Sequence, residues 1–134
     1  MTIFVRCTLP LPPGINEQYA TVNGRRVLSR AARRWKAAAT QHLQQLSIPE
    51  EFRRTLQTGY LALFIDFYFA TPLRRDLDGG LKITQDVICD TLSIDDRRVV
   101  DIHLIKRIDP LNPRIEVELE ALPTWQFDAE RRVL

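Results

Sequence analysis

The clearest hydrophobic pattern in the chain is a strict alternation between residues 115 and 120. The apolar positions are Ile115, Val117 and Leu119, and the polar ones are Glu116, Glu118 and Glu120. A period of two residues is typical of a strand with one buried and one exposed face. The sequence therefore predicts a half-exposed antiparallel strand whose glutamates form a solvated edge.

Three other segments have the composition of strands, over residues 2–9, 60–70 and 99–107. The segment 60–70 is a nearly continuous run of aromatic and branched residues, which predicts a central, buried strand. Between the first two strands, Asn23-Gly24 predicts a tight hairpin over residues 21–27.

Two segments have helical periodicity. Ser29 is a suitable N-cap for a helix that reaches about Leu46, with one apolar face made of Ala32, Trp35, Ala39, Leu43 and Leu46. A second helix is expected from about Leu77 to Leu92, with Gly79-Gly80 weakening its first turn. Residues 49–58 are expected to be a connector.

This order of elements predicts an α+β fold, with a small mixed sheet and two main helices. A single domain is expected over residues 1–134, because this length is typical of one domain with a real core. The tail over 123–134 is expected either to be mobile or to dock through Trp125 and Phe127.

Composition excludes few functions. No apolar run is long enough to span a membrane, and the first residues do not have the pattern of a signal peptide. Cys7 and Cys89 are far apart and form no disulfide framework, so a cytoplasmic location is expected. The net charge of +2 neither requires nor excludes nucleic acid as a partner.

Basic residues are concentrated within twelve positions that contain no acid. They are Arg25, Arg26, Arg30, Arg33, Arg34 and Lys36. On the expected helix, Arg30, Arg33 and Arg34 lie opposite the apolar face. This arrangement is typical of the solvated back of a helix, and the alternative is a stripe that binds DNA phosphates.

The strongest chemical signal is the run Arg74-Arg75-Asp76-Leu77-Asp78, followed by Lys82 and by Asp95-Asp96. Carboxylates are the usual protein ligands of Mg²⁺, and arginines suit phosphate binding. If the chain turns back after Leu92, Asp96 can approach Asp76 and Asp78, and their repulsion then favours a bound cation. Such a metal could polarise a phosphodiester and activate water.

Less specific interpretations exist for each of these residues. A single aspartate here could simply cap the helix, and Lys82 could form an i,i+4 ion pair with Asp78 worth about 0.3–0.5 kcal/mol. Asp66, inside the central strand, is either a further metal ligand or a hydrogen-bonded edge residue. His42 and His103 lack the spacing of a zinc site, and no phosphate-binding glycine loop is present.

The stretch from Arg74 to Asp101 resembles the RusA family of Holliday-junction resolvases. That family combines an arginine-rich approach, an Asp-Leu-Asp-Asn motif, a lysine four residues later, and an Asp-Asp pair before a Val-Val-Asp strand. In this chain the elements are Arg74-Arg75, Asp76-Leu77-Asp78, Lys82, Asp95-Asp96 and Val99-Val100-Asp101. The segment from Leu9 to Asn16, with Tyr19, resembles the proline-rich entry of the family.

The resemblance implies a RusA-like, intertwined homodimer that depends on Mg²⁺, with Mn²⁺ as the alternative ion. Such an enzyme cuts four-way DNA junctions by paired symmetric nicks in recombination and repair. Matching positions make Asp76, Asp78 and Asp96 the metal ligands and Lys82 the essential lysine. Arg75 matches a basic residue of the family that is implicated in DNA contact. The full set of expected DNA-binding residues adds Arg74, Asn16 and the basic stripe of Arg30, Arg33 and Arg34.

The chain departs from the family pattern at Gly79, where the family has asparagine, and in a segment between Lys82 and Asp95 that is about one residue short. A second hypothesis is therefore a protein that binds branched DNA with weak or lost cleavage. A third is an unrelated phosphoryl-transfer enzyme that acts on a small substrate.

Overall fold

The computed structural model describes residues 3–127 and has an α+β fold built on a four-stranded mixed sheet. The strands lie in the order β1 (Phe4–Pro10), β6 (Arg114–Leu122), β4 (Tyr60–Phe69) and β5 (Val99–Ile108). β6 is antiparallel to both of its neighbours, whereas β4 and β5 are parallel. β4 is an inner strand, as its continuous apolar run predicts.

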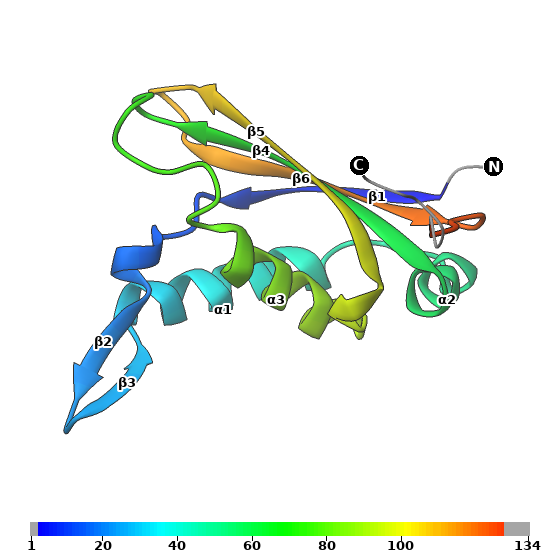
Figure 1. Ribbon diagram of the computed structural model, residues 1–134, viewed down its shortest axis with the longest axis horizontal. Helices are drawn as coiled ribbons and strands as arrows, with labels where there is room; N and C mark the ends of the chain where they lie inside the picture. Colours follow the sequence, from blue (N-terminus) through cyan, green and yellow to red (C-terminus); the bar gives the residue numbers. More distant parts are fainter. Residues whose placement is uncertain (1–2, 128–134) are drawn as a thin grey trace, which may run out of the picture.

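The helices α1 (Arg30–Gln44) and α3 (Leu81–Leu92) lie side by side against one face of the sheet (Figure 1). Their apolar faces pack on the alternate residues of β4 and β6 that point to this side, including Ile65, Phe67 and Ile115. Trp35 of α1 also donates a hydrogen bond to the Pro10 carbonyl over 2.7 Å, which fastens the helix to the end of β1. Within residues 3–127, the opposite face of the sheet carries no helix (Figure 1).

The expected connector over residues 49–58 is wrong, because this segment contains α2 (Glu50–Thr58). Glu50 and Glu51 lie in its first turn, where carboxylates interact favourably with the helix dipole. Leu56 is its one buried residue, so the segment shows little of the apolar periodicity by which a helix is recognised.

The glutamates of β6 lie on the open face of the sheet and not at its edge, so the expected edge position is wrong. β6 is hydrogen-bonded on both sides, to β1 and to β4, and its buried and half-buried residues alternate as predicted. A period of two residues identifies the two faces of a strand but not its place in the sheet.

The α3 helix begins at Leu81, four residues later than expected. Residues 76–80 form turns in which the Asp78 carbonyl accepts a hydrogen bond from the Leu81 amide over 3.1 Å. Gly80 lies so close to Pro12 that a Cβ atom there would be 2.6 Å from the proline ring, and 3.1 Å from Phe67. Gly80 therefore allows this turn to pack against the core.

The predicted hairpin is present as β2 (Tyr19–Val22) and β3 (Arg25–Leu28), and it projects away from the rest of the molecule (Figure 1). Ser29 caps α1 as predicted, accepting a hydrogen bond from the Ala32 amide over 3.1 Å.

At the other end of the chain, the edge of the Phe127 ring contacts Tyr60, with 5.3 Å between ring centroids. Phe127 is one of the two residues expected to dock the tail, and residues 128–134 lie outside the described residues. No helix in the described part of the chain has the length and apolar character needed to cross a membrane.

Candidate active site at the acidic loop

The loop between β4 and α3 carries two of the predicted metal ligands. We call residues 74–80 the acidic loop. Asp76 and Asp78 are exposed, and within residues 3–127 their carboxylates form no ion pair with any basic side chain. Their main-chain carbonyls accept the hydrogen bonds of the turns instead, which leaves both carboxylates available to a ligand.

The acidic loop meets the proline-rich segment that follows β1. The two segments line a depression of about 160 Å³ made by Gly14, Ile15, Asn16, Glu17, Arg74, Arg75, Asp76 and Gly79. The structure therefore brings Asn16 to the same depression as Arg74, Arg75 and Asp76, although about sixty residues separate them in sequence. A carboxylate, an amide and basic groups together suit a metal-associated phosphate.

Gln18 holds this junction of segments together, and sequence reasoning missed it. Its side-chain amide donates to the Pro13 carbonyl over 2.9 Å and to the Gly79 carbonyl over 2.8 Å. The main-chain carbonyl of Gln18 accepts a hydrogen bond from the Ser29 amide over 2.9 Å, and the residue is only 2% exposed. A single glutamine in a turn carries no periodic or motif signal that could have identified it.

Arg74 and Arg75 have different environments. Arg74 is exposed, whereas Arg75 is half-buried, donates to the Pro12 carbonyl over 2.6 Å and lies over the Phe69 ring. Burial lowers the pKa of the Arg75 guanidinium, and the nearby Glu17 carboxylate opposes this effect. Arg75 thus fastens the acidic loop to the proline-rich segment.

Lys82 lies in the first turn of α3 and pairs with Asp86, one turn further along the helix. The Nζ and Oδ1 atoms are 2.5 Å apart, and this hydrogen bond is the main reason that the pKa of Lys82 is raised. The alternative pairing with Asp78 is wrong, because α3 begins only at Leu81 and Asp78 lies in the preceding turn. Asp86 could have been found from its i,i+4 spacing to Lys82.

The two aspartates that follow α3, Asp95 and Asp96, have different environments. Asp95 caps the short helix η2 (Asp96–Arg98) and forms an ion pair with Arg97 over 2.9 Å, which lowers the pKa of its carboxyl. Asp96 is exposed and has no such partner within the described residues, and its negative charge further raises the pKa of Lys82. Asp96 is therefore close enough to act on Lys82.

The expected convergence of the three aspartates is not present as a preformed metal centre. Within residues 3–127, no group of three acidic, histidine or cysteine side chains is placed to hold a metal ion. Asp76 and Asp78 precede the N-terminus of α3, whereas Asp96 follows its C-terminus in the short helix η2, which contacts α3. The donor chemistry nevertheless fits Mg²⁺, since all three are exposed carboxylates without cationic partners.

The predicted DNA-binding arginines of α1 are exposed. Arg33 donates to the Leu28 carbonyl over 3.2 Å, and this contact joins the start of the helix to the end of the hairpin. A second depression of about 360 Å³, lined by Ile15, Asn16, Tyr19, Ala20, Thr21 and Arg26, shares two residues with the depression at the acidic loop. The basic hairpin is thus adjacent to the candidate site.

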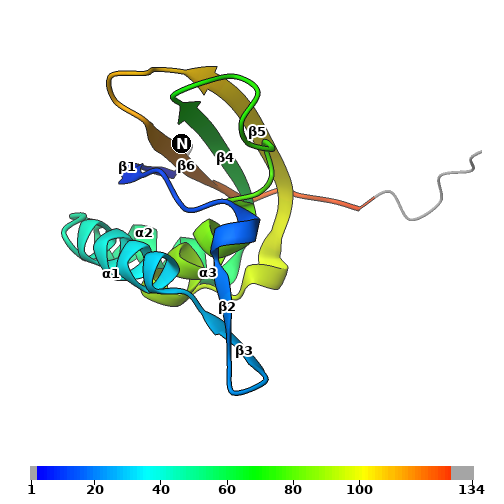
Figure 2. The ribbon, with the colours of Figure 1, turned by 90° about the vertical axis from the view of Figure 1, so that its left-hand side faces the viewer.

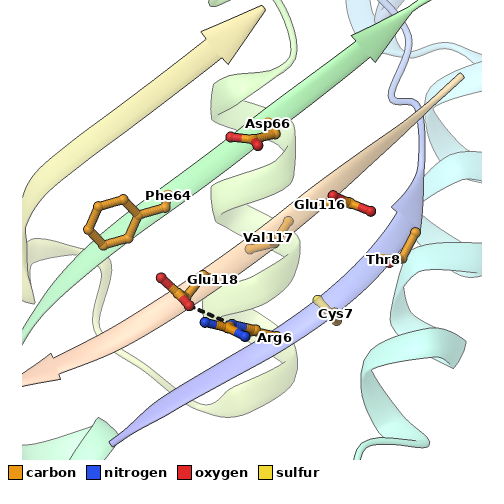
Figure 3. A pocket seen from close by; sticks show the side chains of 8 residues that line it. All are labelled: Arg6, Cys7, Thr8, Phe64, Asp66, Glu116, Val117 and Glu118. Atoms are coloured by element: carbon orange, nitrogen blue, oxygen red, sulfur yellow. Dashed lines mark hydrogen bonds and ion pairs between the residues drawn. The ribbon is translucent and has the colours of Figure 1, made fainter. Parts of the chain in front are cut away.

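Asp66 does not belong to this site. It lies on the open face of the sheet, where its carboxylate accepts a hydrogen bond from the Arg107 Nε over 2.8 Å. This face contains a shallow hollow of about 730 Å³, lined by Arg6, Cys7, Thr8, Phe64, Asp66, Glu116, Val117 and Glu118 (Figure 3). The hydrogen-bonded alternative is the one observed, although β4 is an inner strand and not an edge.

Comparison with known proteins identifies the family of the chain. A family model described as endodeoxyribonuclease RusA matches residues 10–120, which confirms the resemblance based on the sequence motifs. The curated proteins contain no significant match. A similar solved structure is 2C-methyl-D-erythritol 2,4-cyclodiphosphate synthase from Plasmodium vivax, with 12% identity, a TM-score of 0.34, and coverage of 90% of this chain and 93% of that one.

Proposed function

Because this chain belongs to the RusA family of endodeoxyribonucleases, we propose that it resolves four-way DNA junctions by paired symmetric nicks that depend on Mg²⁺. The observation that carries the proposal is that three exposed carboxylates, Asp76, Asp78 and Asp96, form no ion pair within the described residues, and that Asp96 acts on Lys82. Unpaired acids in one region repel each other, and a divalent cation relieves this repulsion.

In this proposal Asp76, Asp78 and Asp96 hold Mg²⁺, or Mn²⁺ in its place. The metal supplies a Lewis acid for the phosphate and lowers the pKa of the attacking water. Lys82 remains cationic because Asp86 accepts its hydrogen bond, and it stabilises negative charge that develops on the phosphate oxygens. Arg74 and Asn16 bind the DNA backbone, and Arg75 keeps the acidic loop in place.

The exposed arginines of α1 extend the DNA-binding surface beyond the site. Two symmetric nicks require two active sites, which a homodimer with a two-fold axis provides. We place this activity in the cytoplasm, in line with Cys7 and Cys89, which are not joined in a disulfide.

A second candidate function is binding of branched DNA with weak or lost cleavage, and Gly79 is the observation that favours it. The residue lines the depression beside Asp76, at the position where the family has asparagine. A Cβ atom at Gly79 would meet the Asp76 oxygen and the Ile15 nitrogen at 3.6 Å, an ordinary contact. An asparagine therefore fits here, and its absence removes a polar group from the site.

The test is incubation of the purified protein with an end-labelled four-way junction and Mg²⁺. We expect symmetric nicks in opposite strands, which EDTA and the Asp78→Asn variant abolish, while Asp66→Asn on the open face of the sheet cuts normally. Binding without nicks in both Mg²⁺ and Mn²⁺ would contradict cleavage and support the second candidate. In that case Gly79→Asn should restore nicking if this position is the only defect.

A further inference from the structure

The hairpin of residues 19–28 is the most isolated element of the described chain. Figures 1 and 2 show it extending away from the sheet and from both main helices. Every residue of β2 is exposed, as are three of the four in β3, and its close neighbour is the short helix η1 (Ile15–Glu17). A two-stranded hairpin is at best marginally stable alone, and within this one only Leu28, at its base, packs against the core, so the exposed part needs another explanation.

The shape of the hairpin is fixed at both of its ends. At the tip, Asn23 and Gly24 have φ angles of 51° and 76°, the left-handed pair of a tight two-residue turn. At the base, the Ser29 hydroxyl donates to the Glu17 carbonyl over 2.6 Å, and Gln18 joins the base to Gly79 of the acidic loop. The hairpin is thus a narrow arm whose position is set relative to the candidate site.

The charge of this region suits a polyanion. Residues 18–49 contain six of the 19 basic residues and none of the 17 acidic ones, so the rest of the chain holds 13 basic and 17 acidic residues. Arg25 and Arg26 lie on the hairpin itself. The open face of the sheet of a second copy offers a weaker match, because Glu118 and Glu116 already pair with Arg6 and Arg114 over 2.6 and 3.4 Å.

The hairpin also exposes apolar side chains that the core does not use. Val22, next to the tip, is 52% exposed, and Tyr19 near the base is 40% exposed beneath the guanidinium of Arg26, 4.3 Å from its ring centroid. Proteins that bend or open DNA often insert an apolar side chain between base pairs. A two-stranded ribbon also has a width that DNA grooves admit.

We propose that the hairpin of residues 19–28 recognises the branch point of the DNA. Val22 enters the unstacked bases at the centre of the junction, and Arg25 and Arg26 bind the flanking phosphates. The inference rests on the proposed function for its DNA substrate, but it concerns selection of branched over linear DNA and does not require cleavage.

Binding measured in EDTA tests the proposal without any contribution from catalysis. Fluorescence anisotropy compares the affinity for a four-way junction with that for a linear duplex of equal length. We expect Val22→Ser to weaken junction binding about tenfold and to leave duplex binding unchanged, since the shorter polar side chain no longer wedges between bases. The matched control is Leu111→Ser, an exposed apolar residue in the turn between β5 and β6.

The proposed phosphate contacts of Arg25 and Arg26 are tested by the salt dependence of binding. The double variant Arg25→Ala/Arg26→Ala should lower the slope of log K against log salt by about two, one for each lost phosphate contact. The control is Arg53→Ala/Arg54→Ala on α2, which lies at the other end of the molecule from the hairpin (Figure 1). Unchanged slopes for both double variants would overturn the phosphate contacts of the hairpin.

A base analogue reports insertion directly. With 2-aminopurine at the branch point, the wild-type protein should raise the fluorescence by unstacking the base, and Val22→Ser should not. Equal fluorescence, or equal weakening of junction and duplex binding by Val22→Ser, would overturn the inference. So would a change from dimer to monomer in light scattering of the variants, which would identify the hairpin as a contact between copies.

These outcomes separate the two proposals. A wild-type protein that binds junctions and unstacks the branch point but does not nick with any divalent metal contradicts the proposed cleavage and supports the role of the hairpin. A protein that nicks junctions and whose Val22→Ser variant binds and unstacks normally contradicts only the role of the hairpin. Circular dichroism of each variant confirms that the fold is intact.

Discussion

Two regions of the molecule are rich in acidic residues, and they differ in how their charges are compensated. On the open face of the sheet, Asp66 pairs with Arg107 over 2.8 Å and Glu118 pairs with Arg6 over 2.6 Å. Around the acidic loop, Asp76, Asp78 and Asp96 have no cationic partner within residues 3–127. The paired carboxylates are neutralised by the protein itself, whereas the unpaired carboxylates are available to bind a ligand.

The difference has a structural origin. In the sheet, strand register places opposite charges across from each other, as for Arg6 and Glu118 of β1 and β6. The acidic loop has no register of this kind, and its nearest lysine, Lys82, pairs with Asp86. The carboxylates of Asp76 and Asp78 therefore form no ion pair within the described residues, which leaves them available to an added cation.

The largest expected effect is on catalysis. Asp78→Asn should reduce nicking of a four-way junction by roughly 100-fold or more, because a lost metal ligand removes several kcal/mol of transition-state stabilisation. Asp66→Asn, the same change on the open face, should retain activity within about twofold. Equal losses in single-turnover assays would show that the two acidic regions do not differ in function.

Stabilisation of the protein by a metal ion should depend on the carboxylates of only one of the two regions. A ligand at about 100 times its Kd adds about 2.7 kcal/mol to the free energy of unfolding, so Mg²⁺ should raise the Tm measured by calorimetry. We expect Asp76→Asn/Asp78→Asn to lose this rise, and Glu116→Gln/Glu118→Gln to keep it. A rise of the same size in the first double variant would place the metal elsewhere.

The acidic loop should depend on a neutral side chain more than the sheet face depends on its ion pairs. Gln18→Leu leaves the Gly79 and Pro13 carbonyls without their shared donor, at a cost of about 1–3 kcal/mol in urea unfolding. Gln57→Leu, which removes one hydrogen bond to the Leu92 carbonyl, is the matched control and should cost less. A Gln18 variant as stable as the wild type would contradict the importance of this contact.

The smallest effect is expected on the open face. Arg107→Ala removes the partner of Asp66 from an exposed position, so the free energy of unfolding should fall by about 0–1 kcal/mol. High salt should reduce this difference further, because screening weakens exposed ion pairs. A larger loss, or a loss of nicking, would mean that this face takes part in function.

Much of the fold could be predicted from the sequence where periodicity was strong. The alternation in β6, the apolar run of β4 and the capped start of α1 all correspond to observed elements. α2 was missed because Leu56 is its only buried residue. The late start of α3 depends on the contact of Gly80 with Pro12, which no local pattern reveals.

The site could be predicted only in part. Motif spacing identified the exposed carboxylates and Lys82, which all lie near α3. Asn16 was expected to bind DNA, but its meeting with the acidic loop was not predicted, and the role of Gln18 likewise arises from hydrogen bonds between segments distant in sequence. That the three aspartates form no preformed metal centre within residues 3–127 could not be read from spacing, because it depends on how the chain turns back after α3.

The contacts of Gln18 also have a consequence for motion. One residue joins the proline-rich segment, the acidic loop and the first residue after the hairpin, through Pro13, Gly79 and Ser29. Segments that share such a contact open together as one cooperative unit. Amide protons at the hairpin base and in the acidic loop should therefore exchange with solvent in a single correlated event, so that the two segments share one lifetime.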